Sequence, residues 1–154
     1  MEIERKWLLK EVPKDLEERE SFPIEQYYIS TDPVIRVRKR GEEHFLTVKG
    51  SGMLAHEEVE MRISGEAYGR LAAKADGCPI IKRRYLIPLE DGKVIELDHF
   101  QSPNEGLYLA EVEFGSVEEA EAFKAPEWFG RDVTMDSAYH NSVMAANAAA
   151  KEGK

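Results

Sequence analysis

Charged and apolar residues alternate along one predicted β-strand after another in this sequence, and the alternation limits the folds open to it. In the N-terminal segment, Glu2, Glu4 and Lys6 are separated by Ile3 and Arg5. Side chains of a strand point alternately to its two faces, so these three charged groups share one face at intervals of roughly 6.6 Å. Two carboxylates at that spacing suit one hard divalent cation, and the adjacent ammonium group suits a phosphate oxygen.

Like charges occupy neighbouring same-face positions in most of these segments. The acidic residues of the pattern are Glu2, Glu4, Glu58, Glu60, Glu96, Asp98, Glu111 and Glu113. The basic residues are Lys6, Arg36, Arg38, Lys49, Arg62, Lys82 and Arg84. If the charged faces met water, both signs would be expected to mix, because adjacent like charges are mildly destabilising. The alternative is a barrel whose charged faces point inward, where a ligand binds between them.

Eight segments predict strands, and turns typical of hairpins connect most of them. They are residues 2–9, 26–30, 34–40, 45–49, 57–63, 80–88, 93–100 and 107–114. Hairpins join antiparallel neighbours, and eight antiparallel strands can close into a barrel without free edges. Spacing and composition predict helices at residues 12–19, 65–75, 116–123 and 137–150. We therefore expect an α+β protein: a closed eight-stranded antiparallel β-barrel with short surrounding helices and a C-terminal helix.

Composition restricts the class of partner. The chain has 154 residues, which fits a single domain over residues 1–154. Its formal net charge of −9 argues against a nucleic-acid or anionic-membrane surface but leaves room for an anion held inside the protein. The sequence has no apolar run of membrane-spanning length, and Glu2 and Glu4 are atypical of a secretory signal. With the single cysteine, Cys78, these features favour a cytoplasmic protein.

The two charge groups together indicate a polyanion and divalent cations as ligands. Arginine pairs bind phosphate oxygens in bidentate fashion, and carboxylates hold Mg²⁺ or Mn²⁺, which can bridge phosphates and activate a water. Phosphoryl transfer needs little beyond such positioning and charge neutralisation. The sequence contains no Walker-type phosphate loop, and its four histidines (His44, His56, His99 and His140) lack zinc-type spacing. The charged strand faces are therefore the candidate site.

The N-terminal segment also resembles a known family signature. Glu2-Ile3-Glu4-Arg5-Lys6 is similar to the ExExK motif of the CYTH superfamily, the triphosphate tunnel metalloenzymes. Further motifs follow in the family's order: Arg36-Val37-Arg38, Leu46-Thr47-Val48-Lys49-Gly50, Glu58-Val59-Glu60, Lys82-Arg83-Arg84-Tyr85, Glu96-Leu97-Asp98 and Glu111-Val112-Glu113-Phe114. The resemblance covers nearly the whole chain. It implies a closed tunnel of eight antiparallel strands.

The resemblance implies roles for individual residues as well. The implied metal ligands are Glu2, Glu4, Glu111 and Glu113, followed by Glu58, Glu60 and Asp98. The residues implied to bind a triphosphate are Lys6, Arg36, Arg38, Lys49, Arg62, Lys82 and Arg84. In compact bacterial members a tyrosine of the second strand lies near the ExExK lysine, and Tyr28 matches it, so Lys6 and Tyr28 are the expected catalytic pair. Tyr139 and Asn141 resemble residues of the family's C-terminal helix near the tunnel mouth, or are ordinary packing residues.

The leading expectation is metal-dependent hydrolysis of inorganic triphosphate to pyrophosphate and phosphate, with Mg²⁺ or Mn²⁺ as cofactor. Alternatives within the family are a class IV adenylyl cyclase and a nucleoside or thiamine triphosphatase. A non-catalytic binder of polyphosphate or nucleotide could lose the carboxylates, all of which are present here. A structural barrel with a charged exterior is the remaining alternative. The expected partner is a small-molecule triphosphate, without nucleic acid or membrane, for a monomer or homodimer.

Overall fold

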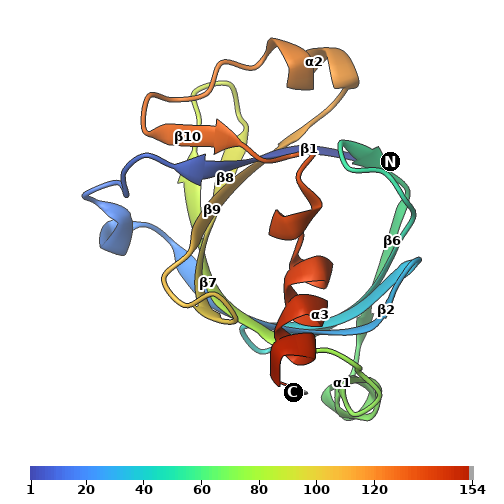
Figure 1. Cartoon of the computed structure of the whole chain (residues 1–154). Coiled ribbons are helices and arrows are strands. Elements are labelled where there is room, and N and C mark those ends of the chain that lie inside the picture. The colour runs from blue at the N-terminus through green and yellow to red at the C-terminus, as the bar shows by residue number, and fades with distance from the viewer. Residues whose placement is uncertain (153–154) are drawn as a thin grey trace.

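The alternating segments form one antiparallel sheet that curls into a barrel (Figure 1). The structure is a computed structural model that describes residues 1–152. The strands of this described part are β1 (Glu2–Leu9), β2 (Ser21–Thr31), β3 (Val34–Arg40), β4 (Glu43–Lys49), β5 (Ala55–His56), β6 (Glu58–Ile63), β7 (Ile80–Pro88), β8 (Val94–Ser102), β9 (Tyr108–Phe114) and β10 (Phe129–Asp132). Each of the eight predicted strands corresponds to one of them, and the predicted fold class is confirmed.

Closure of the barrel depends on a very short strand. Around the ring the order is β1-β9-β8-β7-β2-β3-β4-β6, with β10 on the outer side of β1. The ring closes through β5, which directly precedes β6 and pairs with β1. This pairing places His56 opposite Glu2 and Ala55 opposite Ile3. Because β5 and β10 are too short to show an alternating pattern, the sequence does not predict them.

β2 is longer than predicted, since it begins at Ser21 and not at residue 26. Pro23 disfavours a strand interior because proline has no N–H to donate. Here the carbonyl of Pro23 accepts a hydrogen bond from the backbone N–H of Gly41, and the residue lies opposite Arg83 of β7. The longer β2 joins β3 to β7 along the length of the barrel wall.

Two predicted helices are confirmed in place: α1 (Gly65–Ala72), which ends before residue 75, and α2 (Val117–Ala122). The predicted helix at residues 12–19 is wrong. Only a 3₁₀ turn, η1 (Leu16–Glu18), forms there, because Leu16 is its single buried residue and no apolar stripe supports a longer helix. None of the helices in the described part is long and apolar enough to cross a membrane.

The predicted C-terminal helix is divided into two elements. The 3₁₀ turn η2 (Ser137–Tyr139) is followed by α3 (Asn141–Glu152), and the extended backbone of His140 separates them. α3 lies across one opening of the barrel (Figure 1). Beneath it an apolar cluster that includes Tyr28, Phe100 and Met144 fills that mouth. The C-terminal segment therefore covers one end of the lumen.

The main apolar core lies outside the barrel wall. Apolar residues of β1, β8 and β9 pack beneath α2 and β10, and the Trp7 ring lies 4.8 Å from that of Phe129 and 5.6 Å from that of Phe123. The charged faces of these strands are thereby turned into the lumen. Six charged side chains are at most 9% exposed: Lys6, Arg36, Lys82, Arg84, Asp98 and Glu111. The prediction of inward-facing charges is confirmed, and the alternative of a charged exterior face is wrong.

Candidate active site in the barrel lumen

The barrel encloses a cavity of about 430 Å³ with a mostly charged wall. All the predicted site residues line this cavity except Arg62 and Asp98. The cavity is also lined by Glu96, an acidic residue of the predicted pattern, by Asn141, which resembles a residue near the family's tunnel mouth, and by Arg40, His56 and His140, which had no predicted role. The sequence pattern therefore identified most of one continuous site.

Strand register brings these side chains together, because directly opposite residues of antiparallel strands share a face. Between β1 and β9, Glu4 lies opposite Glu113, and Lys6 lies opposite Glu111. Glu96 of β8 lies opposite the same Glu111. Acidic side chains of three adjacent strands thus meet on one side of the lumen.

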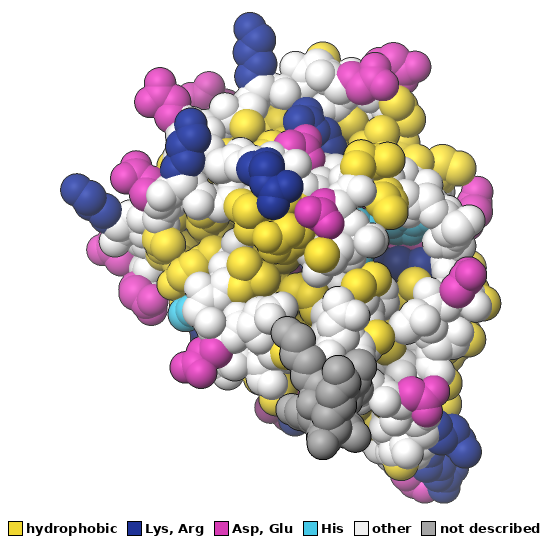
Figure 2. All heavy atoms as spheres, viewed as in Figure 1, with side chains coloured by type: hydrophobic (Ala, Val, Ile, Leu, Met, Phe, Trp, Pro, Cys, Tyr) yellow, Lys and Arg dark blue, Asp and Glu magenta, His cyan; other side chains and the backbone are white. Residues whose placement is uncertain are grey.

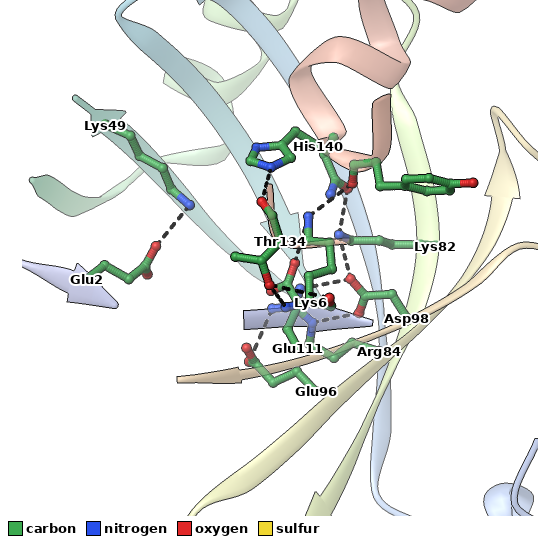
Figure 3. Close-up of polar contacts among 12 residues, drawn as sticks. Glu2, Lys6, Lys49, Lys82, Arg84, Glu96, Asp98, Glu111, Thr134 and His140 are labelled. Carbon is green, nitrogen blue, oxygen red and sulfur yellow. Dashed lines mark hydrogen bonds and ion pairs between the residues drawn. The ribbon is translucent and has the colours of Figure 1, made fainter. Parts of the chain in front are cut away.

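Next to this acidic side, Asp98 of β8 lies directly opposite Arg84 of β7 and contacts two cations of the basic wall, Arg84 and Lys82 (Figure 3). Arg84 donates from Nε and Nη2 to the two Asp98 carboxylate oxygens at 2.8 and 2.9 Å. Lys82 Nζ lies 2.7 Å from Oδ2 of the same carboxylate. Burial opposes ionisation, but these two cations lower the pKa of Asp98. Because cations engage both oxygens, the contacts favour a positioning role for Asp98 over the predicted metal ligation.

The basic side chains of this wall remain crowded despite Asp98. Burial, with the nearby Arg84 and Arg38 guanidinium groups, lowers the pKa of Lys82 to about 7 against the attraction of Asp98. Burial and the charges of Arg36 and Arg84 lower the pKa of Arg38 to about 9. The buried Nε of Arg36 has no hydrogen-bond partner among the described residues. A buried donor without a partner is costly, so this wall is suited to bind an anion.

The C-terminal segment contributes two acceptors to the lumen. The Asn141 side-chain oxygen accepts hydrogen bonds from Lys82 Nζ at 2.8 Å and from Gln26 Nε2 at 3.2 Å. Lys6 Nζ donates to the backbone oxygen of Tyr139 at 3.1 Å. Asn141 therefore reaches the site through its side chain, whereas Tyr139 does so through its backbone and packs its ring in the cluster under α3.

Lys6 and Tyr28 line the same cavity, in agreement with the family resemblance. Lys6 Nζ lies 3.1 Å from Glu111 Oε1 (Figure 3). Burial opposes the Lys6 charge, but the Glu111 and Glu4 carboxylates outweigh it and raise the pKa of Lys6. Tyr28 is buried, and its hydroxyl accepts a hydrogen bond from Gln26 Nε2 at 2.9 Å. A charged ammonium from β1 and a fixed phenol from β2 thus meet the same lumen, although β9, β8 and β7 lie between these two strands in the sheet.

The acidic side holds a compact set of possible metal donors. A carboxylate oxygen of Glu2, one of Glu4 and a ring nitrogen of His56 all lie within 4.8 Å of one another. Burial and the Glu111 charge raise the pKa of Glu4 to about 8. Burial and a hydrogen bond with Glu2 raise the pKa of Glu58 to about 7. A divalent cation would relieve this crowding, and the donor set fits Mg²⁺ or Mn²⁺.

The remaining predicted residues separate into two groups. Glu60 and Glu113 line the cavity; Glu60 accepts a hydrogen bond from the Thr47 hydroxyl at 3.2 Å, and burial and nearby carboxylates raise the pKa of Glu113. The Arg62 side chain is 69% exposed and pairs with Glu43, because β6 continues beyond the end of the cavity. The structure does not bring Arg62 to the other cations.

Comparison with known proteins identifies the family, although no family model matches the chain. An inorganic triphosphatase of Nitrosomonas europaea is 39% identical over 147 residues, which cover 94% of this chain and 96% of that protein. An inorganic triphosphatase of Acetivibrio thermocellus is 35% identical over 149 residues, covering 95% of this chain and 94% of that protein. The chain belongs to the inorganic triphosphatase family. A crystal structure of an inorganic triphosphatase matches the barrel with a TM-score of 0.68 at 37% identity, covering 94% of each chain.

Several lumen residues of this member of the triphosphatase family went unassigned at the level of sequence, although an alternating signal was present. His56 precedes Glu58 by two positions, and Gln26 precedes Tyr28 by two. Continuing each same-face series by one step would have placed both residues in the lumen. Asn141 gave no alternating signal, because it reaches the cavity from a helix start and not from a strand, and only the family resemblance pointed to it.

Proposed function

We propose that this chain is a CYTH-type triphosphate tunnel enzyme that hydrolyses inorganic triphosphate to pyrophosphate and phosphate. The supporting observation is that basic and acidic side chains occupy separate parts of one cavity. A basic wall with an unpartnered Arg36 Nε shares this cavity with the cluster of Glu2 and Glu4. The activity named for the two bacterial relatives agrees with that arrangement. The proposed enzyme acts in the cytoplasm on a small-molecule triphosphate, as a monomer or homodimer.

In the proposed complex the basic wall binds the phosphate oxygens. Arg36 and Arg38 lie at alternate positions of β3, so their guanidinium groups repeat along the lumen like the phosphates of a linear chain. Arg84 lines the cavity and is held in place by Asp98 through Nε and Nη2 and by Glu96 through Nη1. Lys49 lies 3.2 Å from Glu2, at the junction of the basic and acidic groups. Binding an anion here would relieve the mutual repulsion of the cations.

Mg²⁺ or Mn²⁺ would be held by Glu2 and Glu4, with Glu58, Glu60 and Glu113 close by on the same wall. A dication bound there neutralises phosphate charge and lowers the pKa of a water. Glu111 also lines this region, but its contact with Lys6 assigns it first to holding that ammonium group in place. The protein's own part is to orient the substrate between the two walls and to shield it from bulk water.

Lys6 and Tyr28 are the proposed catalytic pair. Both meet the cavity, and the hydrogen bond from Gln26 fixes the Tyr28 hydroxyl, so the pair can orient the terminal phosphate or the attacking water. Tyr28→Phe should lower the kcat for triphosphate by about 100-fold, the low end of what a positioned proton-transfer group contributes. Phosphate release measured at saturating substrate, with circular dichroism as the folding control, tests this. An unchanged kcat would make Tyr28 a packing residue only.

The lumen suits an inorganic triphosphate better than a nucleotide. Among the described residues that line the cavity, Tyr28 is the one with a benzene ring, and most of the others are charged. A nucleobase site usually has apolar and aromatic walls with a few polar groups. The direct test is phosphate release from triphosphate, ATP and pyrophosphate, each with Mg²⁺ and with Mn²⁺. We expect the highest kcat/KM on triphosphate, and a preference for ATP or no hydrolysis of any of them would overturn the proposal.

A further inference from the structure

His56 lies in the cavity wall beside the acidic cluster, and packing alone does not require a histidine there. It is 6% exposed, it lines the cavity, and its Nε2 lies 2.6 Å from Glu2 Oε1. Register explains the position: β5 sets His56 directly opposite Glu2, so both side chains leave the sheet on the lumen face. The other histidine of the cavity wall, His140, instead makes a hydrogen bond with the backbone oxygen of Thr134 through its Nε2 (Figure 3).

The loop before β5 is built to present His56 at this point. Gly52 adopts a φ of +123°, and a Cβ at that position would lie 2.1 Å from the backbone oxygen of Ala55. Only glycine fits such a turn. The backbone N–H of Glu4 donates to the oxygen of Leu54 at 3.0 Å, which ties the loop to β1 beside the carboxylates. The tight turn and this hydrogen bond fix the imidazole relative to Glu2 and Glu4.

The negative charge of the carboxylates around His56 favours a bound cation. The carboxylates of Glu2, Glu4 and Glu58 gather here, and Lys49, 3.2 Å from Glu2 and 4.0 Å from Glu58, is the cation with which two of them pair. Across the same cavity the buried Arg36 Nε has no partner among the described residues, which independently indicates that an anionic ligand enters the lumen. A metal between the carboxylates and that anion would meet the imidazole as well.

We propose that His56 is a nitrogen ligand of the catalytic metal and that it biases this site toward Mn²⁺ over Mg²⁺. The inference rests on the proposed function, since it concerns the metal of that reaction. Mg²⁺ prefers oxygen ligands, whereas an imidazole nitrogen suits first-row transition metals better. A site of two carboxylates and one imidazole therefore discriminates between these two ions in a way that a site of carboxylates alone does not.

The alternative role for His56 is to position Glu2 by a hydrogen bond without touching the metal. Pulsed electron paramagnetic resonance of the Mn²⁺-loaded protein separates the two roles, because only a directly bound nitrogen is strongly coupled to the electron spin. The probe is Mn²⁺ alone, without triphosphate, so that the result does not depend on turnover. Protein labelled with ¹⁵N-histidine, compared with unlabelled protein, assigns the coupling to an imidazole.

We expect histidine nitrogen coupling in the wild-type protein and its loss in His56→Gln, which keeps a hydrogen-bond donor near Glu2. By calorimetry the Mn²⁺ dissociation constant of His56→Gln should rise about tenfold, the scale on which changes around a metal site act, while that of Mg²⁺ changes much less. His99→Ala, which removes an imidazole stacked on Tyr108 away from the cavity, is the matched control and should behave as wild type.

Two outcomes would overturn the proposal. Absence of histidine coupling in the wild-type protein with Mn²⁺ bound would assign His56 to positioning, and coupling that persists in His56→Gln would assign the nitrogen to another histidine. Either result leaves the proposed function standing if triphosphate is hydrolysed. If the wild-type protein shows the histidine nitrogen coupling but does not hydrolyse triphosphate, the proposed function is wrong and the manganese site still stands.

Discussion

The basic wall of β3 and β7 and the acidic wall of β1, β6 and β9 differ in how the protein balances their charges. On the basic wall, Asp98 pairs with Lys82 and Arg84, and Asn141 accepts a further hydrogen bond from Lys82. On the acidic wall, repulsion and burial raise the pKa of Glu4 to about 8 and that of Glu58 to about 7. Lys82 and Arg84 thus have a fixed counter-ion. On the acidic wall Glu111 pairs with Lys6 and Glu2 with Lys49, whereas Glu4 has no salt-bridge partner among the described residues and depends most on a ligand.

That difference assigns separate tasks to the two walls. Charges with a fixed counter-ion are already oriented, as a binding surface for phosphate requires. Carboxylates without one are poised to exchange protons for a dication. The face seen in Figure 2 shows neither property, because acidic and basic side chains are interspersed over it. Substitutions on the acidic wall should therefore affect catalysis without harming stability, and those on the basic wall should affect stability and substrate affinity.

The largest effect is expected from Glu4→Gln. The amide has nearly the same shape but lacks the charge that holds a dication, so kcat/KM for triphosphate should fall by about 100-fold or more, since a metal contributes several kcal/mol to the transition state. The melting temperature without ligand should stay the same or rise, because one crowded carboxylate is gone. Phosphate release and thermal denaturation measure the two quantities, with Glu127→Gln, an exposed position, as the control. Near-normal turnover with saturating metal would remove Glu4 from the metal site.

Asp98→Asn should have the opposite profile. Removing one partner from a buried ion pair leaves uncompensated charge, at a cost of about 3 kcal/mol in unfolding free energy. For a chain of this size that corresponds to a drop of about 6–12 °C in melting temperature. Mn²⁺ affinity, measured without triphosphate, should be unchanged, because both Asp98 oxygens contact cations.

The matched control for Asp98→Asn is Asp91→Asn, which removes an exposed partner of Lys93 and should leave the melting temperature nearly unchanged. A large loss of Mn²⁺ affinity in Asp98→Asn would restore the metal-ligand role that the sequence predicted. The pair of variants thus tests directly whether the basic wall contains its own counter-ion.

The sequence was sufficient to predict which charged residues line the lumen, but not which of them pair with one another. Alternation fixes which strand face a residue takes, so the amino-acid pattern alone was enough to place Glu2, Glu4, Arg36 and Arg38 in the lumen. Alternation does not give the register between paired strands, and it is the register of β7 and β8 that sets Asp98 opposite Arg84.

The alternating pattern also does not show how far along the barrel axis a residue lies. Arg62 shares the face of Glu58 and Glu60 but lies beyond the end of the cavity. His56 belongs to a two-residue strand, so its place in the lumen follows only when the alternation of β6 is continued one step before Glu58. Asn141 lies at a helix start, where there is no strand pattern to continue. The sequence pattern therefore did not predict how far along each strand the cavity extends, or which loops reach it.

A smaller effect should follow from Arg36→Lys on the basic wall. Lysine keeps the charge but has neither the guanidinium fork nor the Nε that lies unpartnered in the wall. We expect KM for triphosphate to rise about tenfold, since charge-assisted hydrogen bonds contribute about 1.5–3 kcal/mol each, with a smaller change in kcat. Steady-state kinetics separate the two parameters. If kcat falls while KM is unchanged, Arg36 acts on the transition state and not on ground-state binding.

The smallest expected effect is the part of the pH dependence of triphosphate binding that comes from Lys82 on the basic wall. The pKa of Lys82 in the ligand-free protein is lowered to about 7, so its ammonium group is mostly charged at pH 6.5 and mostly neutral at pH 8. A bound phosphate favours the charged form, and the affinity of the protein for triphosphate should therefore fall as pH rises through this range. If only the charged form binds well, the apparent dissociation constant rises in proportion to the lost fraction, by about five- to tenfold between pH 6.5 and 8.

Lys82→Arg isolates this contribution, because a guanidinium group stays protonated over the whole range. Calorimetric titration of triphosphate at constant ionic strength should show the steep rise in wild type and a shallower one in Lys82→Arg. Ionisation of triphosphate itself, and of Glu4 and Glu58 in the same pH range, contributes to the curves of both proteins, so the difference between the two curves reports Lys82. Parallel curves would mean that Asp98 keeps Lys82 charged throughout, and the basic wall would then be better balanced than its crowding indicates.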